Sequence, residues 1–440
     1  MVFGWNNRGR RWRADNASRE SHEGDPSGGS LEIVVPGHFM CPISLEMMKD
    51  PVTLSSGIAY DRESIERWLE DGNFTCPVTN QVLRSFDLIP NHTIWRMIQD
   101  WCTENRFSRI PTPRVPVTPC EVTEVLAGIS DAAWQGDSFA CLELVQRIKK
   151  WGGESERNRR CIVVNSSATS LTLAFTRFAA ASSCTEKTDT ELMEALMSAL
   201  NWMFPLGSEA RHHLGSPAAL RCMVQYLKNG NLSIQRNAIL VLKEVCRDSQ
   251  NTLALVEVEG VHEILLQFVK HPIHPALTKA SLSIMFCLIA SSDKQSRRLV
   301  GLGAVVAVLE SLVDTDKSQS EKALGVLDGL IGCEEGMGEA YSNALTVPLI
   351  VKKILHVSEL ATEYSISILL NLCRHEGNGK SAMMEALQVG AFQKLLVLLQ
   401  VGCGNETREK GTELLKLMNP YRDEMECIES VDFKNLKRSF

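Results

Sequence analysis

The stretch that decides the fold of the first part of the chain reads FMCPISLEMMKDPV (39–52), SSGIAYDRESIERWLEDG (55–72), TCPVTNQVL (75–83) and LIPNHTIWRMIQDW (88–101). Residues 52–54 and 58–60 are short runs of β-forming residues, and the Ser-Ser-Gly between them has the composition of a tight hairpin turn. Asp61 is placed to cap a helix that follows, and Gly72 is placed to end it in a left-handed conformation. The pattern predicts a hairpin followed by a helix of about three turns.

A second helix is predicted after Pro90, with Asn91 as its cap and with Ile94, Ile98 and Trp101 on one apolar face. Two loops of similar sequence flank the first helix, CPIS at 41–44 and CPVT at 76–79. This part of the chain is therefore expected to be a small α+β domain.

The order of CPIS, DPV, GIAYDRESIERWL, CPVT and LIPN closely resembles the U-box, the zinc-free relative of the RING domain in ubiquitin ligases. The resemblance covers about residues 36–109. It implies a surface that holds a ubiquitin-charged conjugating enzyme, and it implies no covalent intermediate on the domain itself.

The cysteines and histidines of this stretch are too few for a RING. Two tetrahedral zinc ions need eight such ligands, and residues 38–102 contain only His38, Cys41, Cys76, His92 and Cys102. A single site around His38 and Cys41 stays open as an alternative, but a second close pair of ligands is missing. We expect neither metal nor cofactor. In the family, hydrogen bonds and ion pairs replace the metal, and the candidates here are Glu46, Asp50, Asp61, Arg62 and Asn91.

Five positions match the family's contacts with the conjugating enzyme: Ile43 and Leu45 in the first loop, Trp68 on the helix, and Pro77 and Asn80 in the second loop. Such a patch of apolar, aromatic and proline side chains is typical of an interaction hot spot. Trp68 shares a helix face with Ile65, so contact and core support both stay open for it. Strongly activating ligases often carry arginine where this chain has Asn80, and asparagine has a shorter reach and no charge. We therefore expect activity with weaker locking of the closed conjugate.

The remaining chain divides by composition. Residues 1–35 are rich in Arg, Asn, Ser and Gly and are predicted to form a disordered arm. The arm carries Arg8, Arg10, Arg11 and Arg13; contact with anionic lipid or nucleic acid is the alternative to a solvated tail. Residues 110–119 hold four prolines and predict a semi-rigid linker after the U-box.

From residue 120 to about 430 the sequence predicts a helical repeat array. A core of the form A-x-x-x-L-x-x-L recurs from Ala238, Ala280, Ala323, Ser365 and Gly411, at steps of 42 to 46 residues. A second marker, usually a glycine that opens an apolar helix, recurs at Gly260, Gly303, Thr346 and Gly390. This period is typical of armadillo or HEAT repeats, and the glycine favours armadillo. The fold class is thus mainly α, a small α+β U-box followed by an armadillo-type α-solenoid.

Such arrays bind partner segments along one face. Armadillo proteins that read basic peptides carry asparagine six residues after the first core position, and that register here holds Asn201, Glu244, Phe286, Gly329, Asn371 and Leu417. Because only two of these six residues are asparagine, binding of nuclear-import-type peptides is not expected.

Composition limits the other classes of function. The net charge of −7 gives no general affinity for nucleic acid. No apolar run approaches the ~18 residues of a membrane span, and no leader-like segment opens the chain. The 14 cysteines are scattered singly, which favours free thiols in the cytoplasm or the nucleus.

U-box, proline-rich linker and armadillo repeats together resemble the plant U-box/armadillo ubiquitin-protein ligases. The resemblance implies a RING-type ubiquitin transferase whose repeats bind a protein substrate; a homodimer stays open. One rival reading makes Cys76 or Cys41 a nucleophile that carries ubiquitin, although each precedes a proline in a loop and has no neighbouring base. The other rival is a non-catalytic adaptor that only docks partners.

Overall fold

The structure of the protein is a computed structural model that describes residues 35–105, 117–181, 187–313, 315–375 and 377–424. The described residues fall into two compact units; the first holds those before Pro119 together with residues 153–160, and the second holds the rest. Residues 1–34 of the predicted arm, 110–116 of the predicted linker and 425–430 of the predicted repeats lie outside the described residues. The predicted domain boundaries therefore stay predictions.

The first unit is a small α+β domain. Its elements are η1 (Gly37–Phe39), β1 (Pro51–Thr53), β2 (Ala59–Asp61), α1 (Arg62–Glu70), β3 (Ile89–Pro90) and α2 (His92–Glu104). The strands form one antiparallel sheet in the order β2-β1-β3, with Val52 opposite Tyr60. Gly57 closes the predicted hairpin at a φ of 80°, a left-handed conformation that favours glycine. The predicted hairpin and both helices are confirmed.

The core of the first unit is built from every one of its longer elements. Its largest fully buried side chains are those of Met48, Tyr60, Ile65 and Ile98. The cap of α2 is as predicted, since the side chain of Asn91 accepts the N–H of Ile94 at 2.9 Å. Burial of these apolar groups provides the main free energy of folding for so small a domain.

The second unit is entirely helical among its described residues. Its helices are α3 (Pro119–Gln135), α4 (Ser138–Glu154), α5 (Glu156–Val164), α6 (Ser167–Ala181), α7 (Lys187–Asn201), α8 (Ser208–Leu214), α9 (Pro217–Asn229), α10 (Leu232–Val245), α11 (Ser249–Val256), α12 (Val261–Lys270), α13 (Pro275–Ser291), α14 (Asp293–Gly301), α15 (Ala304–Ser311), α16 (Lys317–Leu330), α17 (Glu334–Ser342), α18 (Thr346–Lys353), α19 (Glu359–Arg374), α20 (Gly379–Gln388), α21 (Ala391–Val401), α22 (Asn405–Met418) and the 3-10 helix η2 (Asn419–Glu424). Two of these helices, α4 and α5, extend into residues 153–160, which are grouped with the first unit.

From α8 onward the helices follow in threes, a short helix, a second helix and a long helix, as in armadillo repeats. The predicted glycine markers are the residues that begin the second helix of a repeat. Gly260, Gly303 and Gly390 stand at φ values of 80°, 81° and 84°, where a Cβ atom is disfavoured. Two of the described repeats lack this glycine: Leu345 precedes α18 in a right-handed conformation, and Ser216 precedes α9 in an extended one. The repeat reading and the mainly α fold class are confirmed.

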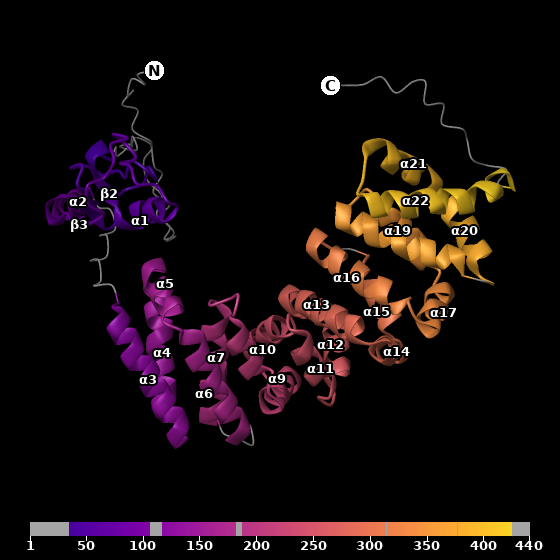
Figure 1. Cartoon of the computed structure of the whole chain (residues 1–440), viewed down its shortest axis with the longest axis horizontal. Helices are drawn as coiled ribbons and strands as arrows, with labels where there is room; N and C mark the ends of the chain where they lie inside the picture. Colours follow the sequence, from indigo (N-terminus) through magenta and orange to yellow (C-terminus); the bar gives the residue numbers. More distant parts are fainter. Residues whose placement is uncertain (1–34, 106–116, 182–186, 314, 376, 425–440) are drawn as a thin grey trace, which may run out of the picture. The chain divides into compact units, whose positions relative to one another are not determined.

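The long helices α10, α13, α16, α19 and α22 pack side by side in sequence, each against the next. Figure 1 shows them following one another along the repeat unit, from magenta to yellow. The row buries small residues such as Ala238, Ala280 and Ala323 between neighbouring repeats. Its open face is therefore continuous from one repeat to the next.

No single helix within the described ranges has the length and apolar composition of a membrane span. Only α20 and α21 reach that length and composition together, and they are bent by 75° at the break between them.

A chain that starts at Pro119 is expected to fold without the first unit. Each repeat buries its apolar face against its neighbours, so the array needs no contribution from the sheet. Circular dichroism and gel filtration test this expectation, with the full chain as control. Aggregation of the shorter chain under conditions that keep the full chain monodisperse would show that the two units share a core.

Candidate functional site

The two similar loops have the same backbone geometry. Loop 1 is residues 41–46 and loop 2 is residues 76–81. In loop 1 the N–H of Cys41 donates to the carbonyl of Glu46 at 2.8 Å, and the N–H of Leu45 donates back to Cys41 at 2.9 Å. In loop 2 the N–H of Cys76 donates to Gln81, and that of Asn80 donates to Cys76, both at 2.8 Å.

The fifth residue of each loop, Leu45 or Asn80, stands in a left-handed conformation at a φ of 56°. Asparagine tolerates this conformation better than leucine does, because its short polar side chain bonds locally. A bridge between Met40 and Met47 closes loop 1, and a bridge between Thr75 and Val82 closes loop 2. The repeated C-P-x-x sequence thus encodes a repeated structure.

The end of strand β2 holds both loops through sulfur. The backbone N–H of Asp61 donates to Sγ of Cys41 at 3.3 Å. The preceding residue, Tyr60, places its hydroxyl 3.0 Å from Sγ of Cys76 and accepts the N–H of Val78 at 3.3 Å. All three side chains, Cys41, Tyr60 and Cys76, are fully buried. Two adjacent residues therefore fix the two loops, each through one cysteine.

The burial and hydrogen bonds of Cys76 bear on whether it could act as a nucleophile. Burial raises the pKa of its thiol, but hydrogen bonds, that of Tyr60 among them, outweigh burial and lower the pKa to about 6. Burial and the bond to Cys76 in turn raise the pKa of Tyr60. A nucleophile must be reached by its reactant, and Cys76 has no exposed surface. The sulfur shares a buried hydrogen bond with the Tyr60 hydroxyl inside the domain.

Polar side chains beneath the loops complete the framework. Arg62 Nε pairs with Asp50 Oδ2 at 2.6 Å, and the carboxylate of Asp61 accepts the backbone N–H groups of Lys49 and Asp50 at 2.7 and 2.9 Å. Asp61 is the N-cap residue of α1 as predicted, but its side chain makes no capping bond, because its carboxylate binds the turn before β1 instead. Glu46 is exposed and makes no side-chain bond to the described residues.

No group of three or more His, Cys, Asp and Glu side chains that could hold a metal comes together among the described residues. In the alternative single site, the ring of His38 lies against Phe39, with ring centroids 4.2 Å apart. Cys41 is occupied by the N–H of Asp61.

The predicted docking residues differ in exposure. Leu45 is half exposed, at 50%, and Asn80 is exposed. Ile43 and Pro77 are partly covered, and Ile43 packs against the core. Trp68 also packs against the core, and its Nε1 donates to the carbonyl of Thr75 at 2.9 Å. Trp68 thus supports loop 2 from α1, and its contact with a partner stays a prediction like that of the other four.

Sequence reasoning missed two features of this surface. Val78 in loop 2 is 38% exposed, and Phe74 and Phe86 form an edge-to-face pair with both rings exposed. The roles of Tyr60 and Cys76 were also not predicted. The C-P-x-x motif, which occurs twice, was the sequence signal for these roles. Two similar loops that flank one strand are both expected to be held by that strand.

In the repeat unit, the first two residues of the predicted asparagine register serve the fold itself. Asn201 donates to Asn237 at 2.9 Å. Glu244 is buried, accepts the N–H of Leu206 at 3.1 Å and pairs with Arg247 at 3.2 Å. A continuous ladder of free amides is therefore absent from this part of the described array.

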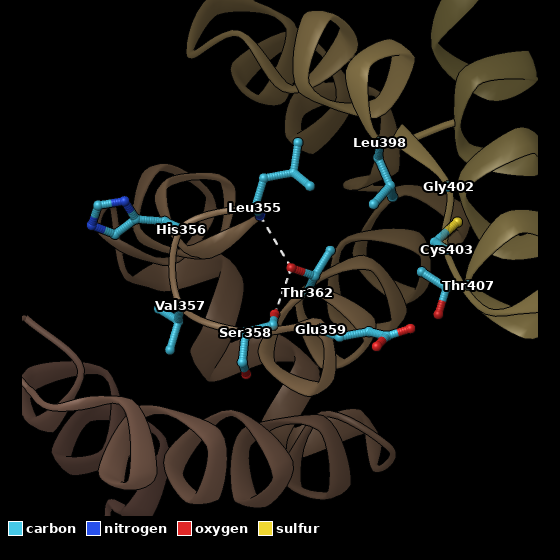
Figure 2. Close-up of a pocket in the computed structure, with 10 residues that line it drawn as sticks. All are labelled: Leu355, His356, Val357, Ser358, Glu359, Thr362, Leu398, Gly402, Cys403 and Thr407. Atoms are coloured by element: carbon cyan, nitrogen blue, oxygen red, sulfur yellow. Dashed lines mark hydrogen bonds between the residues drawn. The ribbon is translucent and has the colours of Figure 1, made fainter. Parts of the chain in front are cut away.

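A cavity of about 350 Å³ lies between the turn before α19 and the start of α22 (Figure 2). Its hydroxyl groups hold that turn. Thr362 Oγ1 accepts the N–H of Leu355 at 3.1 Å and donates to the carbonyl of Ser358 at 2.8 Å, as the dashed lines in Figure 2 show. Ser358 caps α19. We assign this cavity to the packing of neighbouring repeats.

Comparisons with known proteins agree with this description. Residues 35–107 match the U-box domain, and residues 121–438 match the plant U-box protein ARM repeat region. U-box domain-containing protein 21 of Arabidopsis thaliana is 43% identical over 93% of this chain and 94% of its own length. E3 ubiquitin-protein ligase PUB22 of the same plant is 32% identical over 90% of this chain and 97% of its own length.

Among solved structures, a chain from work on the interaction between cadherin and beta-catenin superposes on the fold with a TM-score of 0.54. It covers 70% of this chain and 55% of its own, at 15% sequence identity. This likeness concerns the fold alone.

The geometry around Asp61 predicts opposite outcomes for two substitutions. Asp61→Asn keeps an oxygen for the N–H groups of Lys49 and Asp50, so we expect the free energy of unfolding to stay within about 1 kcal/mol of the wild type. Asp61→Ala leaves both N–H groups without an acceptor and should cost about 1–3 kcal/mol. Urea unfolding of both variants measures the difference. Equal losses in both variants would contradict the assigned role of the Asp61 oxygen.

The difference in stability between the wild type and Asp61→Asn also depends on pH. Burial raises the pKa of Asp61 in the folded state, against smaller opposing effects of its two N–H bonds. The folded protein therefore takes up the proton at a higher pH than the unfolded chain does. As the pH falls through that interval, the wild type gains stability relative to Asp61→Asn.

Proposed function

Because the chain belongs to the plant U-box protein family with armadillo repeats, we propose that it is a ubiquitin-protein ligase. The U-box holds a conjugating enzyme that carries ubiquitin, and the repeats hold a protein substrate. The observation that carries the proposal is the pair of matching loops, fixed without metal by Tyr60 and Asp61, from which Leu45 and Asn80 are exposed.

The proposed mechanism is one of binding and proximity. The thioester between conjugating enzyme and ubiquitin is held in a folded-back conformation, in which attack by a lysine amine is more frequent. The amine replaces the conjugating enzyme's thiol on the ubiquitin carbonyl, so the chemistry takes place on the partner. Rigid loops suit this task, because a docking surface that is already ordered loses little entropy on binding.

The proposed partners are a charged conjugating enzyme and a protein substrate. The proposed location is the cytoplasm or the nucleus, and it is supported by the free thiols of all described cysteines.

A reconstituted reaction tests the ligase against its two rivals. The full chain is incubated with activating enzyme, ubiquitin and a panel of conjugating enzymes. Ubiquitin chains or self-modification support a ligase, and their absence with every conjugating enzyme supports the adaptor. A ubiquitin adduct on this chain that a reducing agent removes would support a catalytic cysteine.

Truncation of exposed loop residues should abolish docking without unfolding the domain. Leu45→Ala and Pro77→Ala remove side chains that reach the surface, and hot-spot losses of ~2 kcal/mol weaken binding more than tenfold. Ile43→Ala is a less clean test, because Ile43 packs against the core and its truncation also lowers stability. Ubiquitin transfer and melting temperature are measured on the same samples.

Met97→Ala is the matched control for these variants. Met97 is 45% exposed on α2, which contributes to neither loop. Its truncation should leave transfer unchanged. Full activity of Leu45→Ala and Pro77→Ala with every conjugating enzyme would refute the proposed docking surface. Unfolding of both variants would show that these side chains belong to the core of the domain.

A gain of activity is expected from Asn80→Arg. Arginine adds a charge and a longer donor at the loop 2 position that faces the conjugate in the proposed complex. The left-handed conformation of residue 80 should cost the variant about 1 kcal/mol of stability. Discharge of ubiquitin to free lysine in a single turnover measures the effect. Gln81→Arg, which adds the same charge one residue later, is the control; an equal gain in both variants would point to net charge instead of a placed contact.

A further inference from the structure

Two aromatic rings meet across the open face of helix α16. Phe286 of α13 and Tyr364 of α19 are in edge contact, with ring centroids 6.5 Å apart. They meet because Gly325 of α16, which lies between them, has no side chain: a Cβ there would stand 3.2 Å from Tyr364 Cζ and 3.3 Å from Phe286 Cδ2. Phe286 is nevertheless 41% exposed. The rings thus form an apolar ledge on the row of long helices.

A carboxylate with one oxygen that lacks a hydrogen-bond partner lies one turn along α16. Asp328 is half buried, and its Oδ1 has neither a hydrogen-bond partner nor contact with solvent. Such an atom is costly, because a buried charge is ordinarily paired or neutralised. Burial raises the pKa of Asp328, and the charge of Glu363 adds to the rise, while a side-chain hydrogen bond with Ser367 and the charge of Lys410 lower it.

Glu363 belongs to the same surface. It precedes Tyr364 on α19, and after burial the charges of Asp328 and Glu363 are the causes that raise the pKa of the Tyr364 hydroxyl. We call Phe286, Asp328, Glu363 and Tyr364 the α16 ledge. It combines two aromatic rings with two carboxylates.

The lysines closest in sequence or position are engaged within their own helices. Lys410 of α22 pairs with Glu406 at 2.7 Å. Lys322, one turn before Gly325 on α16, donates to the hydroxyl of Ser318 at 2.7 Å and to its carbonyl at 3.1 Å. Neither lysine bonds to Asp328 Oδ1, although the charge of Lys410 favours the carboxylate form of Asp328.

From charge complementarity and ring geometry, we propose that the α16 ledge binds an arginine side chain on a segment of the protein substrate. The guanidinium is planar, stacks on aromatic faces and forms paired hydrogen bonds with a carboxylate, whereas the lysine ammonium is a strongly hydrated point charge. A ring ledge beside a carboxylate suits the first better than the second. The inference rests on the proposed function, because it names the kind of segment that the repeats hold.

Pentapeptides of sequence Gly-Ser-X-Ser-Gly with blocked ends test the inference, where X is arginine, lysine or citrulline. Citrulline has the shape of arginine without its charge. Methyl NMR of the isoleucine-labelled full chain reports binding through Ile289, which lies against Gly329, the residue after Asp328. We expect a saturable shift with the arginine peptide and at least fivefold weaker binding of the citrulline and lysine peptides.

Variants locate the site. Asp328→Asn keeps the size of the side chain, and Phe286→Ala removes one ring; each should weaken binding of the arginine peptide at least fivefold. Glu310→Gln removes an exposed carboxylate from α15, outside the row of long helices, and should change nothing. Thermal melting of each variant confirms that it is folded.

Several results would overturn the inference. Equal binding of arginine and citrulline peptides would remove the role of charge, and equal binding of the lysine peptide would remove the preference for a guanidinium. Unchanged affinity in Asp328→Asn would place the peptide elsewhere. If Ile289 of the free chain already has the bound shift, and deletion of residues 1–34 abolishes it, the arginines of this chain occupy the ledge instead of a substrate. The titration uses no ubiquitin, so a chain that binds the peptide but transfers no ubiquitin refutes the ligase proposal alone.

Discussion

The hydrogen bonds between the end of β2 and two buried sulfurs are the constraint on which the geometry of loops 1 and 2 depends. In a RING, metal ions hold each loop from several directions at once. Here Tyr60 and Asp61, adjacent in sequence, point to opposite loops and reach Cys76 and Cys41. Because the contacts are single hydrogen bonds of about 1 kcal/mol each, they hold only where the surrounding core excludes water. The framework is therefore inseparable from the packing of Ile65 and Ile98.

The structure of the repeat unit is determined mainly by local sequence signals. Its helices are set by local signals, a left-handed glycine before the second helix and a polar cap before most of the long helices, such as Asp316 for α16 and Ser358 for α19. Each repeat then buries its apolar face against the next repeat. Because these signals are local, each repeat carries its own helix boundaries in its own sequence.

Much of this architecture can be predicted from the sequence, because hairpin, caps and repeats are local or periodic. The hairpin around Gly57, the cap at Asn91 and the armadillo period are of this kind. What escaped prediction depends on distant partners. Asp61 looks like a helix cap, yet its carboxylate binds N–H groups from the turn before β1. Ile43 looks like a loop residue, yet it packs against the core. A sequence motif identifies which residues are important, but whether their side chains are buried or exposed is known only from the fold.

The α16 ledge illustrates the same limit in the repeat unit. Periodicity places Phe286 and Gly329 at positions where peptide-binding armadillo arrays carry asparagine, and from sequence this departure only argues against one class of ligand. The structure adds that Gly325 lets rings from the helices on either side of α16 meet, and that Asp328 beside them has an oxygen without a partner. An unpartnered buried oxygen lowers the stability of the free protein, and in the proposed complex the arginine compensates for it. In the proposed complex, loss of the asparagine register changes which side chains the row of long helices binds and does not remove its capacity to bind.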